Sequence, residues 1–306
     1  VDALAAVGAT GSLNFLIIGF VLGICSGFCI PVAQYFGAGK EKTMRQCIAN
    51  ALYLSVIVTI VLTVSTLLTT KTILKVMNTP EDIFHQAYSY IIIIFAGIGG
   101  TMFYNMLAGI LRALGDSKTP LYFLIIASIT NIVLDIVFIV AFKSGVAGAA
   151  YATVISQIFS GFLCFLYIKK KFPILKIQKD EFTFDKSLQL QLLKIGLPMA
   201  LQFSITAVGA IILQSAVNSL GSAIVAAITA AGKIQMIVTQ PMETLGVTMA
   251  TYCGQNMGAG KYDRIKEGVK KSVVMSIIYC IFAWALMTFL GSKAALLFID
   301  GSETAI

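Results

Sequence analysis

One acidic residue, Asp135, lies in the middle of the long apolar segment 120–142, and Asn131 precedes it by one helical turn. An ionisable group inside such a segment is costly to bury and is by default a functional candidate. A carboxylate beside an amide can bind Na⁺ through its oxygen atoms, or it can hold a proton. The pair therefore predicts a site for a coupling ion. The alternative is a structural hydrogen bond between two helices.

A second group of polar residues interrupts the apolar segment 222–253. Lys233 and Gln240 are seven residues apart and share a helix face, and Glu243 lies within about 60° of that face. Glu243 could attract a cationic ligand or bind an ion. The alternatives are an ion pair and a position near the membrane surface. Gln202, in the preceding segment, adds neutral polarity. We interpret these four side chains as candidates for a substrate cavity.

Two further apolar segments carry polar faces. A helical period of 3.6 brings small and polar residues of each segment close to one side. Such residues can line a binding site, and they can also simply pack helices together. We assign two of them, Thr101 and Gln157, to the substrate cavity. The complete faces are Tyr90, Gly97, Thr101, Tyr104, Asn105 and Ala108 in segment 86–111, and Thr153, Ser156, Gln157 and Ser160 in segment 146–168.

The composition indicates the scaffold that positions these residues. Apolar residues make up 58% of the chain and charged residues 12%, and the mean hydropathy is +0.90. A soluble domain carries about 25% charged residues. A bilayer core needs about 20 apolar residues per helix. We therefore predict an all-α, polytopic membrane protein with about eight transmembrane helices, at 5–36, 46–70, 86–111, 120–142, 146–168, 190–217, 222–253 and 271–291.

The positions of Lys and Arg predict how the chain is oriented. The loops after the first, third, fifth and seventh apolar segments hold 17 of these residues, Arg112 among them, and the other loops hold 4. The positive-inside rule places the richer set in the cytoplasm, including the two Gly-Ala-Gly-Lys loops and the Lys-rich stretch after residue 168. The net charge of +8 therefore reflects membrane topology and does not indicate nucleic-acid binding.

The chain contains an internal repeat. The stretch from Ala5 to Lys40 matches the stretch from Ala226 to Lys261 at one constant offset, without a gap, and both end in Gly-Ala-Gly-Lys. Six predicted spans lie within this offset, so both copies enter the membrane in the same direction. A parallel repeat of this kind is typical of secondary transporters.

The repeat predicts how the chain is divided. Two complete units as long as the offset would need about 442 residues, so we expect one span to be missing before Val1 and about three after Ile306. Residues 1–170 are then an amino-terminal lobe without its first helix, and 171–187 are a basic cytoplasmic linker. Residues 188–306 are the first three helices of a carboxy-terminal lobe. We expect this chain alone not to transport.

Six short motifs follow one another along the chain in a characteristic order. They are Leu4–Gly8, Gln34–Gly39, Arg112–Pro120, Asn131–Asp135, Ile195–Pro198 and Gly254–Gly260. In this order they resemble the MATE family (multidrug and toxic compound extrusion), in its bacterial DinF-like branch. The resemblance implies twelve helices in two six-helix lobes, and antiport of drugs against H⁺ or Na⁺. It also implies that Tyr90, Asn105 and Thr153 join Asp135 and Asn131 in a cation site of the amino-terminal lobe.

We predict a secondary-active multidrug efflux transporter of the cell membrane, in which two lobes rock around a central cavity and exchange a drug for H⁺ or Na⁺. The expected substrates are small cationic amphipathic drugs. Apart from the coupling ion, with Na⁺ possible at Asp135, we expect no metal or cofactor. The full-length protein is expected to be a monomer in the lipid bilayer.

Two alternatives remain. The first is a lipid or polysaccharide flippase of a related fold. The second and more remote one is a membrane-embedded enzyme, but the sequence has a single His and no paired acidic motif for catalysis. The sequence contains no P-loop motif, so we do not expect ATP to drive transport through this chain.

Overall fold

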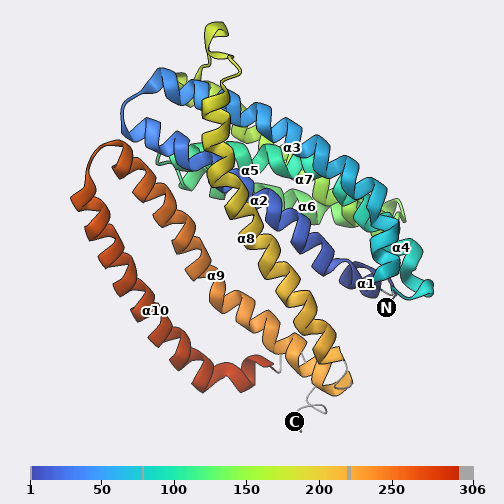
Figure 1. Ribbon diagram of the computed structural model, residues 1–306. Helices are drawn as coiled ribbons and strands as arrows, with labels where there is room; N and C mark the ends of the chain where they lie inside the picture. The colour runs from blue at the N-terminus through green and yellow to red at the C-terminus, as the bar shows by residue number, and fades with distance from the viewer. Residues whose placement is uncertain (1, 78, 219–221, 296–306) are drawn as a thin grey trace.

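The computed structural model describes residues 2–77, 79–218 and 222–295, and every regular element in these ranges is helical (Figure 1). The prediction of an all-α fold is confirmed. A π-helix, η1 (Val137–Ala141), continues α6, and two short 3₁₀ helices, η2 (Pro173–Leu175) and η3 (Lys179–Glu181), lie between α7 and α8. The longer helices are α1 (Asp2–Ala9), α2 (Gly11–Gly37), α3 (Glu41–Val76), α4 (Glu81–Ala96), α5 (Ile98–Ala113), α6 (Lys118–Ile136), α7 (Gly145–Lys171), α8 (Lys186–Asn218), α9 (Ser222–Gly258) and α10 (Tyr262–Ala295).

The helices have the length and composition of membrane spans. Among the described residues, α2, α3, α6 with η1, α7, α8 and α10 contain six stretches that are long and apolar enough to cross a bilayer. The bent pair α4 and α5 makes a seventh. The remaining predicted span, 222–253, coincides with α9, which is not among these seven. The chain is a multi-pass membrane protein.

The predicted span 86–111 lies within this bent pair, so the chain forms two helices there and not one continuous helix. α4 and α5 meet at an angle of 44° around Gly97. α7 passes so close to this point that a Cβ atom on Gly97 would overlap the side chain of Val154. Tyr90 and Asn105 lie on opposite sides of the bend, so they do not share one continuous helix face as the periodicity predicted.

Helix α2 lies at the centre of the fold and packs against α3, α5, α8 and α9. Gly23 and Gly27, one helical turn apart, let the backbone of α8 approach closely. A Cβ atom on Gly23 would lie 2.6 Å from the Cα of Ala200, and one on Gly27 would overlap Gly196. α8 contacts α2 more extensively than it contacts α9. Helices from the second half of the chain are therefore fixed directly on a helix from the first half.

The two Gly-Ala-Gly-Lys loops have the same conformation. Gly39 and Gly260 have φ angles of +67° and +69°, in the left-handed region that favours glycine. In each loop the lysine N–H donates to the carbonyl oxygen five residues earlier, at 3.0 Å in the first loop and 2.8 Å in the second. This agreement is the structural counterpart of the internal repeat in the sequence.

The ends of α2 and α9 that carry these loops touch each other reciprocally. A Cβ atom on Gly37 would overlap the carbonyl oxygen of Gln255, and one on Gly258 would overlap that of Gln34. Both pairs are related by the repeat offset, as a two-fold axis between the two copies requires. We call the side of the molecule that carries the two loops the GAGK end. At this end the two halves of the chain close against each other.

We predict that Gly258→Ala opens the GAGK end. The added Cβ atom meets backbone, which cannot rotate away, so the contact with Gln34 is lost. In a background without native cysteines, a reporter cysteine in place of Thr248 should react several-fold faster with an impermeant thiol reagent applied to the GAGK side. Gly246→Ala is the matched control, because a Cβ atom there meets nothing within 4 Å. Equal labelling in the two variants would contradict the prediction.

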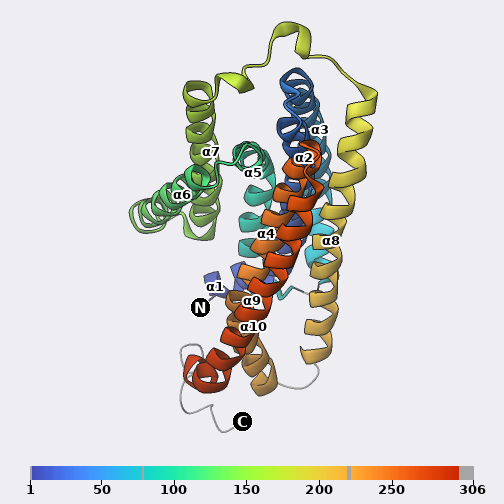
Figure 2. The ribbon, with the colours of Figure 1, turned by 90° about the vertical axis from the view of Figure 1, so that its left-hand side faces the viewer.

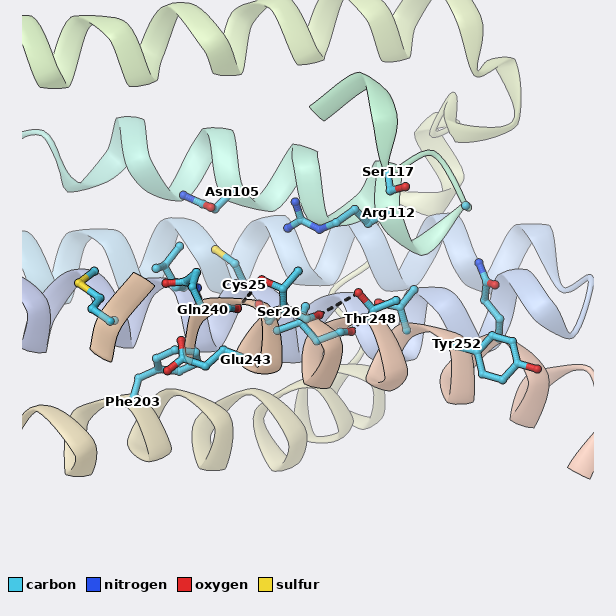
Figure 3. Close-up of a pocket in the computed structure, with 18 of the residues that line it drawn as sticks. Cys25, Ser26, Asn105, Arg112, Ser117, Phe203, Gln240, Glu243, Thr248 and Tyr252 are labelled. Carbon is cyan, nitrogen blue, oxygen red and sulfur yellow. Dashed lines mark hydrogen bonds between the residues drawn. The ribbon is translucent and has the colours of Figure 1, made fainter. Parts of the chain in front are cut away.

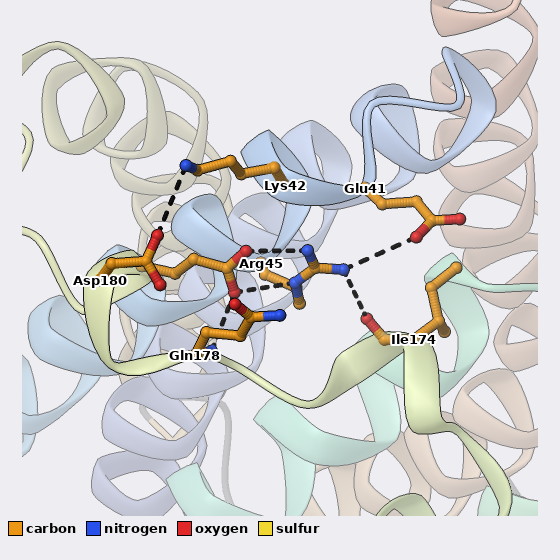
Figure 4. A network of polar contacts seen from close by, with 7 residues as sticks. Glu41, Lys42, Arg45, Ile174, Gln178 and Asp180 are labelled. Carbon is orange, nitrogen blue, oxygen red and sulfur yellow. Dashed lines mark hydrogen bonds and ion pairs between the residues drawn. The ribbon is translucent and has the colours of Figure 1, made fainter.

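The segment between α7 and α8 is held on α3 (Figure 4). Arg45 of α3 donates two hydrogen bonds of 2.8 Å to the Glu181 carboxylate, which also accepts the N–H of Gln178 at 2.9 Å. The amide oxygen of Asn50, also on α3, accepts the N–H of Asp185 at 3.0 Å. These contacts fix the point at which α8 begins.

Helices α6 and α10 present broad apolar faces to the outside of the molecule (Figure 2). On α6, Ile129, Ile132 and Ile136 are each more than half exposed. On α10, Ile278 and Phe282 are exposed to a similar extent. Rows of large apolar side chains of this kind are typical of helices that face lipid or another apolar helix.

Candidate functional site

A cavity of about 720 Å³ lies between helices from the two halves of the chain. Its walls come from α2 and α5 of the first half and from α8 and α9 of the second. Asn105 and Arg112 project from α5 toward α9, which carries Gln240 and Glu243 (Figure 3). Arg112 and Glu243 are the two charged groups among the described residues that line the cavity.

Helical periodicity explains why these side chains converge. The cavity-lining residues of α9 recur every three or four positions, so they form one stripe along the helix. On α5, Asn105 and Arg112 are seven residues apart and thus share a face. The stripe on α9 consists of Met236, Gln240, Glu243, Thr244, Val247, Thr248, Thr251, Tyr252 and Gln255.

Only part of the predicted substrate set lines this cavity. Gln240 and Glu243 do so. Thr101, Gln157 and Gln202 are not among its described lining residues, although Phe203, next to Gln202, is. The side chain of Lys233 lies outside the described residues.

Arg112 was predicted to be a charge of a cytoplasmic loop, and its place at the cavity was not predicted. The structure places Arg112 in the last turn of α5, with its side chain half-buried and at the cavity. The available signal was its spacing from Asn105, which is two helical turns on the same face. The shortened span 86–111 hid this spacing, because α5 continues to Ala113.

The predicted ion site has a partial counterpart between α6 and α7. The Nδ2 of Asn131 donates a long hydrogen bond of 3.5 Å to the Oγ1 of Thr153. The Oδ1 of Asp135 is buried and has no hydrogen-bond partner among the described residues. The hydroxyl of Tyr90 lies within electrostatic range of this carboxylate. α6 turns into the π-helix η1 two residues after Asp135, an irregularity that is frequent at functional sites.

Two predicted residues occupy places other than those assigned to them. Asn105, assigned to the ion site, lines the cavity between the halves and donates to the Thr101 carbonyl oxygen at 2.8 Å. Gln157, assigned to the cavity, lies one turn after Thr153 on α7. Its Oε1 is buried without a hydrogen-bond partner in the described part of the chain. Gln157 therefore belongs with the polar groups between α6 and α7.

Oxygen atoms dominate the site between α6 and α7, and this donor set suits Na⁺ or a proton rather than a transition metal. The described residues contain no group of three or more His, Cys, Asp or Glu side chains that could hold a metal ion. The site thus offers the carboxylate of Asp135, the amides of Asn131 and Gln157, the hydroxyl of Thr153 and the nearby phenol of Tyr90.

Comparison with known proteins identifies relatives of this chain. The MatE family model matches residues 1–137 and 198–306. "Probable multidrug resistance protein YoeA" of Bacillus subtilis (strain 168) is 32% identical, with 99% of this chain and 67% of that protein covered. "Probable multidrug resistance protein YpnP" of the same organism is also 32% identical, with 86% of this chain and 59% of that protein covered. The chain therefore spans about three fifths to two thirds of the length of these relatives.

Solved structures show the same fold. The chain aligns with "Crystal structure of MATE in complex with MaL6" at a TM-score of 0.90 and 24% identity, covering 100% of this chain and 69% of that one. A structure described as "Outward-facing conformation of a multidrug resistance MATE family transporter of the MOP superfamily" aligns at a TM-score of 0.91 and 24% identity, covering 98% and 67%. The family model, the curated relatives and the shared fold lead to one assignment: this chain belongs to the MATE family of membrane transporters.

Proposed function

We propose that the protein exports small drugs across the cell membrane by secondary active transport. The strongest support for this proposal is the cavity of about 720 Å³, which lies between α2 and α5 on one side and α8 and α9 on the other. This volume lies within the range of about 300–1,000 Å³ that is usual for drug-sized ligands. A phospholipid with two acyl chains needs more room, which disfavours a flippase. Glu243 supplies a negative charge for a cationic substrate.

We further propose that inward flow of H⁺ or Na⁺ through the site at Asp135 drives export. The buried, unpartnered Oδ1 of Asp135 supports this role, because such an atom is costly unless it binds an ion or a proton. Asn131, Thr153 and Tyr90 would complete the site. No organic cofactor is needed, and the full-length transporter is proposed to act as a monomer.

The proposed mechanism is alternating access. By the positive-inside rule we place the GAGK end in the cytoplasm. The reciprocal contact of α2 and α9 at this end then closes the cavity toward the cytoplasm. A coupling ion favours one state only through a difference in its affinity for the two states. Release of the drug outside and uptake of the ion are thereby linked.

The test is transport by a full-length protein that contains this sequence, reconstituted in proteoliposomes with separate H⁺ and Na⁺ gradients. Ethidium serves as the cationic substrate. Export driven by either gradient supports the proposal, and the gradient that drives it identifies the coupling ion. Absence of export with both gradients would refute the proposed function.

In the same assay, Glu243→Gln should raise the KM for ethidium by about tenfold or more, because the cation loses its charged partner in a cavity of low dielectric constant. The matched control is Glu267→Gln on α10, where Glu267 is exposed and pairs with Lys271 at 2.6 Å. The control should leave KM unchanged. An unaltered KM in Glu243→Gln would remove this residue from the substrate site.

A further inference from the structure

Arg112 brings into the cavity a positive charge that the described part of the chain does not neutralise. Its guanidinium makes no ion pair within 4.0 Å with any described acidic side chain. It adjoins a smaller pocket that is lined by Cys29 of α2 and Thr251 of α9, among others. Arg112 therefore faces the interface between the two halves of the chain and not the aqueous loop beyond α5.

The acidic residue nearest in sequence, Asp116, is already engaged elsewhere. It follows Arg112 by four positions, but its Oδ1 accepts the backbone N–H of Thr119 at 3.0 Å at the start of α6. The guanidinium is thus available to a ligand. Its planar fork of donors matches a carboxylate, sulfonate or phosphate group with two parallel hydrogen bonds.

Glu243 and Arg112 lie at different depths in the cavity. Arg112 shares the smaller pocket with Val247 and Thr251 of α9. These residues follow Glu243 by four and eight positions, which corresponds to about 6–12 Å along a helix. The cavity thus carries a negative charge at one level and a positive charge about one to two turns nearer the GAGK end.

Apolar side chains line the cavity beside these two charges. Phe15 and Leu22 come from α2, and Phe203 comes from α8. Such walls suit the planar, apolar body of a ligand, and the charged groups at two levels fix its direction.

We propose that the cavity selects amphoteric drug-like molecules, in which a cationic group binds Glu243 and an anionic group binds Arg112. This inference rests on the proposed function of the cavity as the substrate site. It narrows the expected substrates from simple cations to molecules that carry both charges on an apolar body. Arg112 is the residue that makes the cavity favour molecules with both charges over simple cations.

The test compares two dyes that differ in one charge. Rhodamine 110 carries a cationic ring system and a carboxylate, and rhodamine 123 is its methyl ester, which keeps the cation alone. Their equilibrium binding to a purified full-length protein containing this sequence is measured by fluorescence polarisation. Wild-type protein should bind rhodamine 110 several-fold more tightly than rhodamine 123. This comparison requires no substitution.

Arg112→Gln should weaken the binding of rhodamine 110 by about tenfold or more, and it should not weaken that of rhodamine 123, because the purely cationic dye loses only a like charge. Retained rhodamine 123 binding shows that the variant is folded. Arg112→Lys keeps the charge but not the planar fork and should fall between wild type and Arg112→Gln.

The proposal is overturned if wild-type protein does not prefer rhodamine 110, or if Arg112→Gln weakens both dyes equally or neither. Binding decides this inference, and transport decides the proposed function. If the wild-type protein binds rhodamine 110 preferentially and exports neither dye, the selectivity stands while the transport proposal fails. If it exports both dyes with equal affinity, the transport proposal stands and the selectivity fails.

Discussion

Asp135→Asn is expected to abolish gradient-driven efflux in the full-length transporter while leaving the protein folded. The Oδ1 of Asp135 is buried and has no hydrogen-bond partner among the described residues, so the structure itself does not account for its presence. Asn preserves the size of the side chain, but it cannot take up a proton or offer a charge to Na⁺. We expect the transport rate to fall by at least about tenfold, and to lose its dependence on the ion gradient.

Drug binding should be affected much less than transport. Asp135 is not among the described residues that line the cavity, whereas Glu243 and Arg112 are. Equilibrium binding of ethidium to Asp135→Asn should therefore stay within about threefold of wild type. This separation of transport from binding distinguishes a coupling residue from a substrate ligand.

Ser128→Ala on the same helix is the control, because the exposed Ser128 hydroxyl only donates to the Leu124 carbonyl oxygen one turn before it. It should transport like wild type. If Asp135 is merely structural, Asn should be nearly neutral, since an uncharged amide costs less to bury than a carboxylate. Wild-type rates and ion dependence in Asp135→Asn would remove it from the mechanism and direct attention to Glu243.

Features that depend on local periodicity could be predicted from the sequence. The apolar runs indicated the helices, and the polar positions within them pointed to Asp135, Gln240 and Glu243. The stripe on α9 follows from residue spacing alone. The internal repeat was also visible in the sequence, and the two Gly-Ala-Gly-Lys loops that end its copies have the same conformation.

Features that depend on contacts between distant segments could not be predicted. The bend at Gly97 arises where Val154, on the later helix α7, packs against it. Asn105 was assigned to the ion site by the resemblance to the MATE family, and the helical period placed it on one face with Tyr90. The bend removes that shared face. The spacing of Arg112 from Asn105 indicates a shared helix face. That this face meets α9 depends on a contact between distant segments, which the spacing alone does not reveal.

The contact between Arg45 and Glu181 is a further case, since it joins residues 136 positions apart. The linker was interpreted as a basic loop, and its acidic residues, Glu181 among them, had no assigned role. In the structure the Glu181 side chain is 2% exposed and that of Arg45 14% exposed. Glu181 receives two hydrogen bonds from the guanidinium and one from the backbone, so its oxygen atoms are well satisfied.

Glu181→Gln is therefore expected to lower the thermal unfolding midpoint by several degrees. Removing one partner of a buried pair is strongly destabilising. Without the Glu181 charge, Arg45 keeps only its longer ion pair of 3.6 Å with the exposed Glu41. Asp180→Asn is the matched control, because Asp180 pairs with Lys42 at 3.4 Å while both side chains are more than 60% exposed. An exposed pair of this kind contributes little to stability. Equal midpoints for the two variants would show that the buried contact does not hold the linker.

The same carboxylate predicts how stability depends on pH. Hydrogen bonds from Arg45, followed by the one from the Gln178 backbone, lower the pKa of Glu181 from 4.5 to about 2. The folded protein thus favours the charged form, so the stabilisation is complete above a pH of about 4.5 and is lost as the pH falls toward 2. The difference in unfolding midpoint between wild type and Glu181→Gln should therefore be large at neutral pH and shrink progressively below pH 4.5. Thermal unfolding in detergent across this range measures it, and a difference that does not vary with pH would mean that the charge of Glu181 does not stabilise the linker.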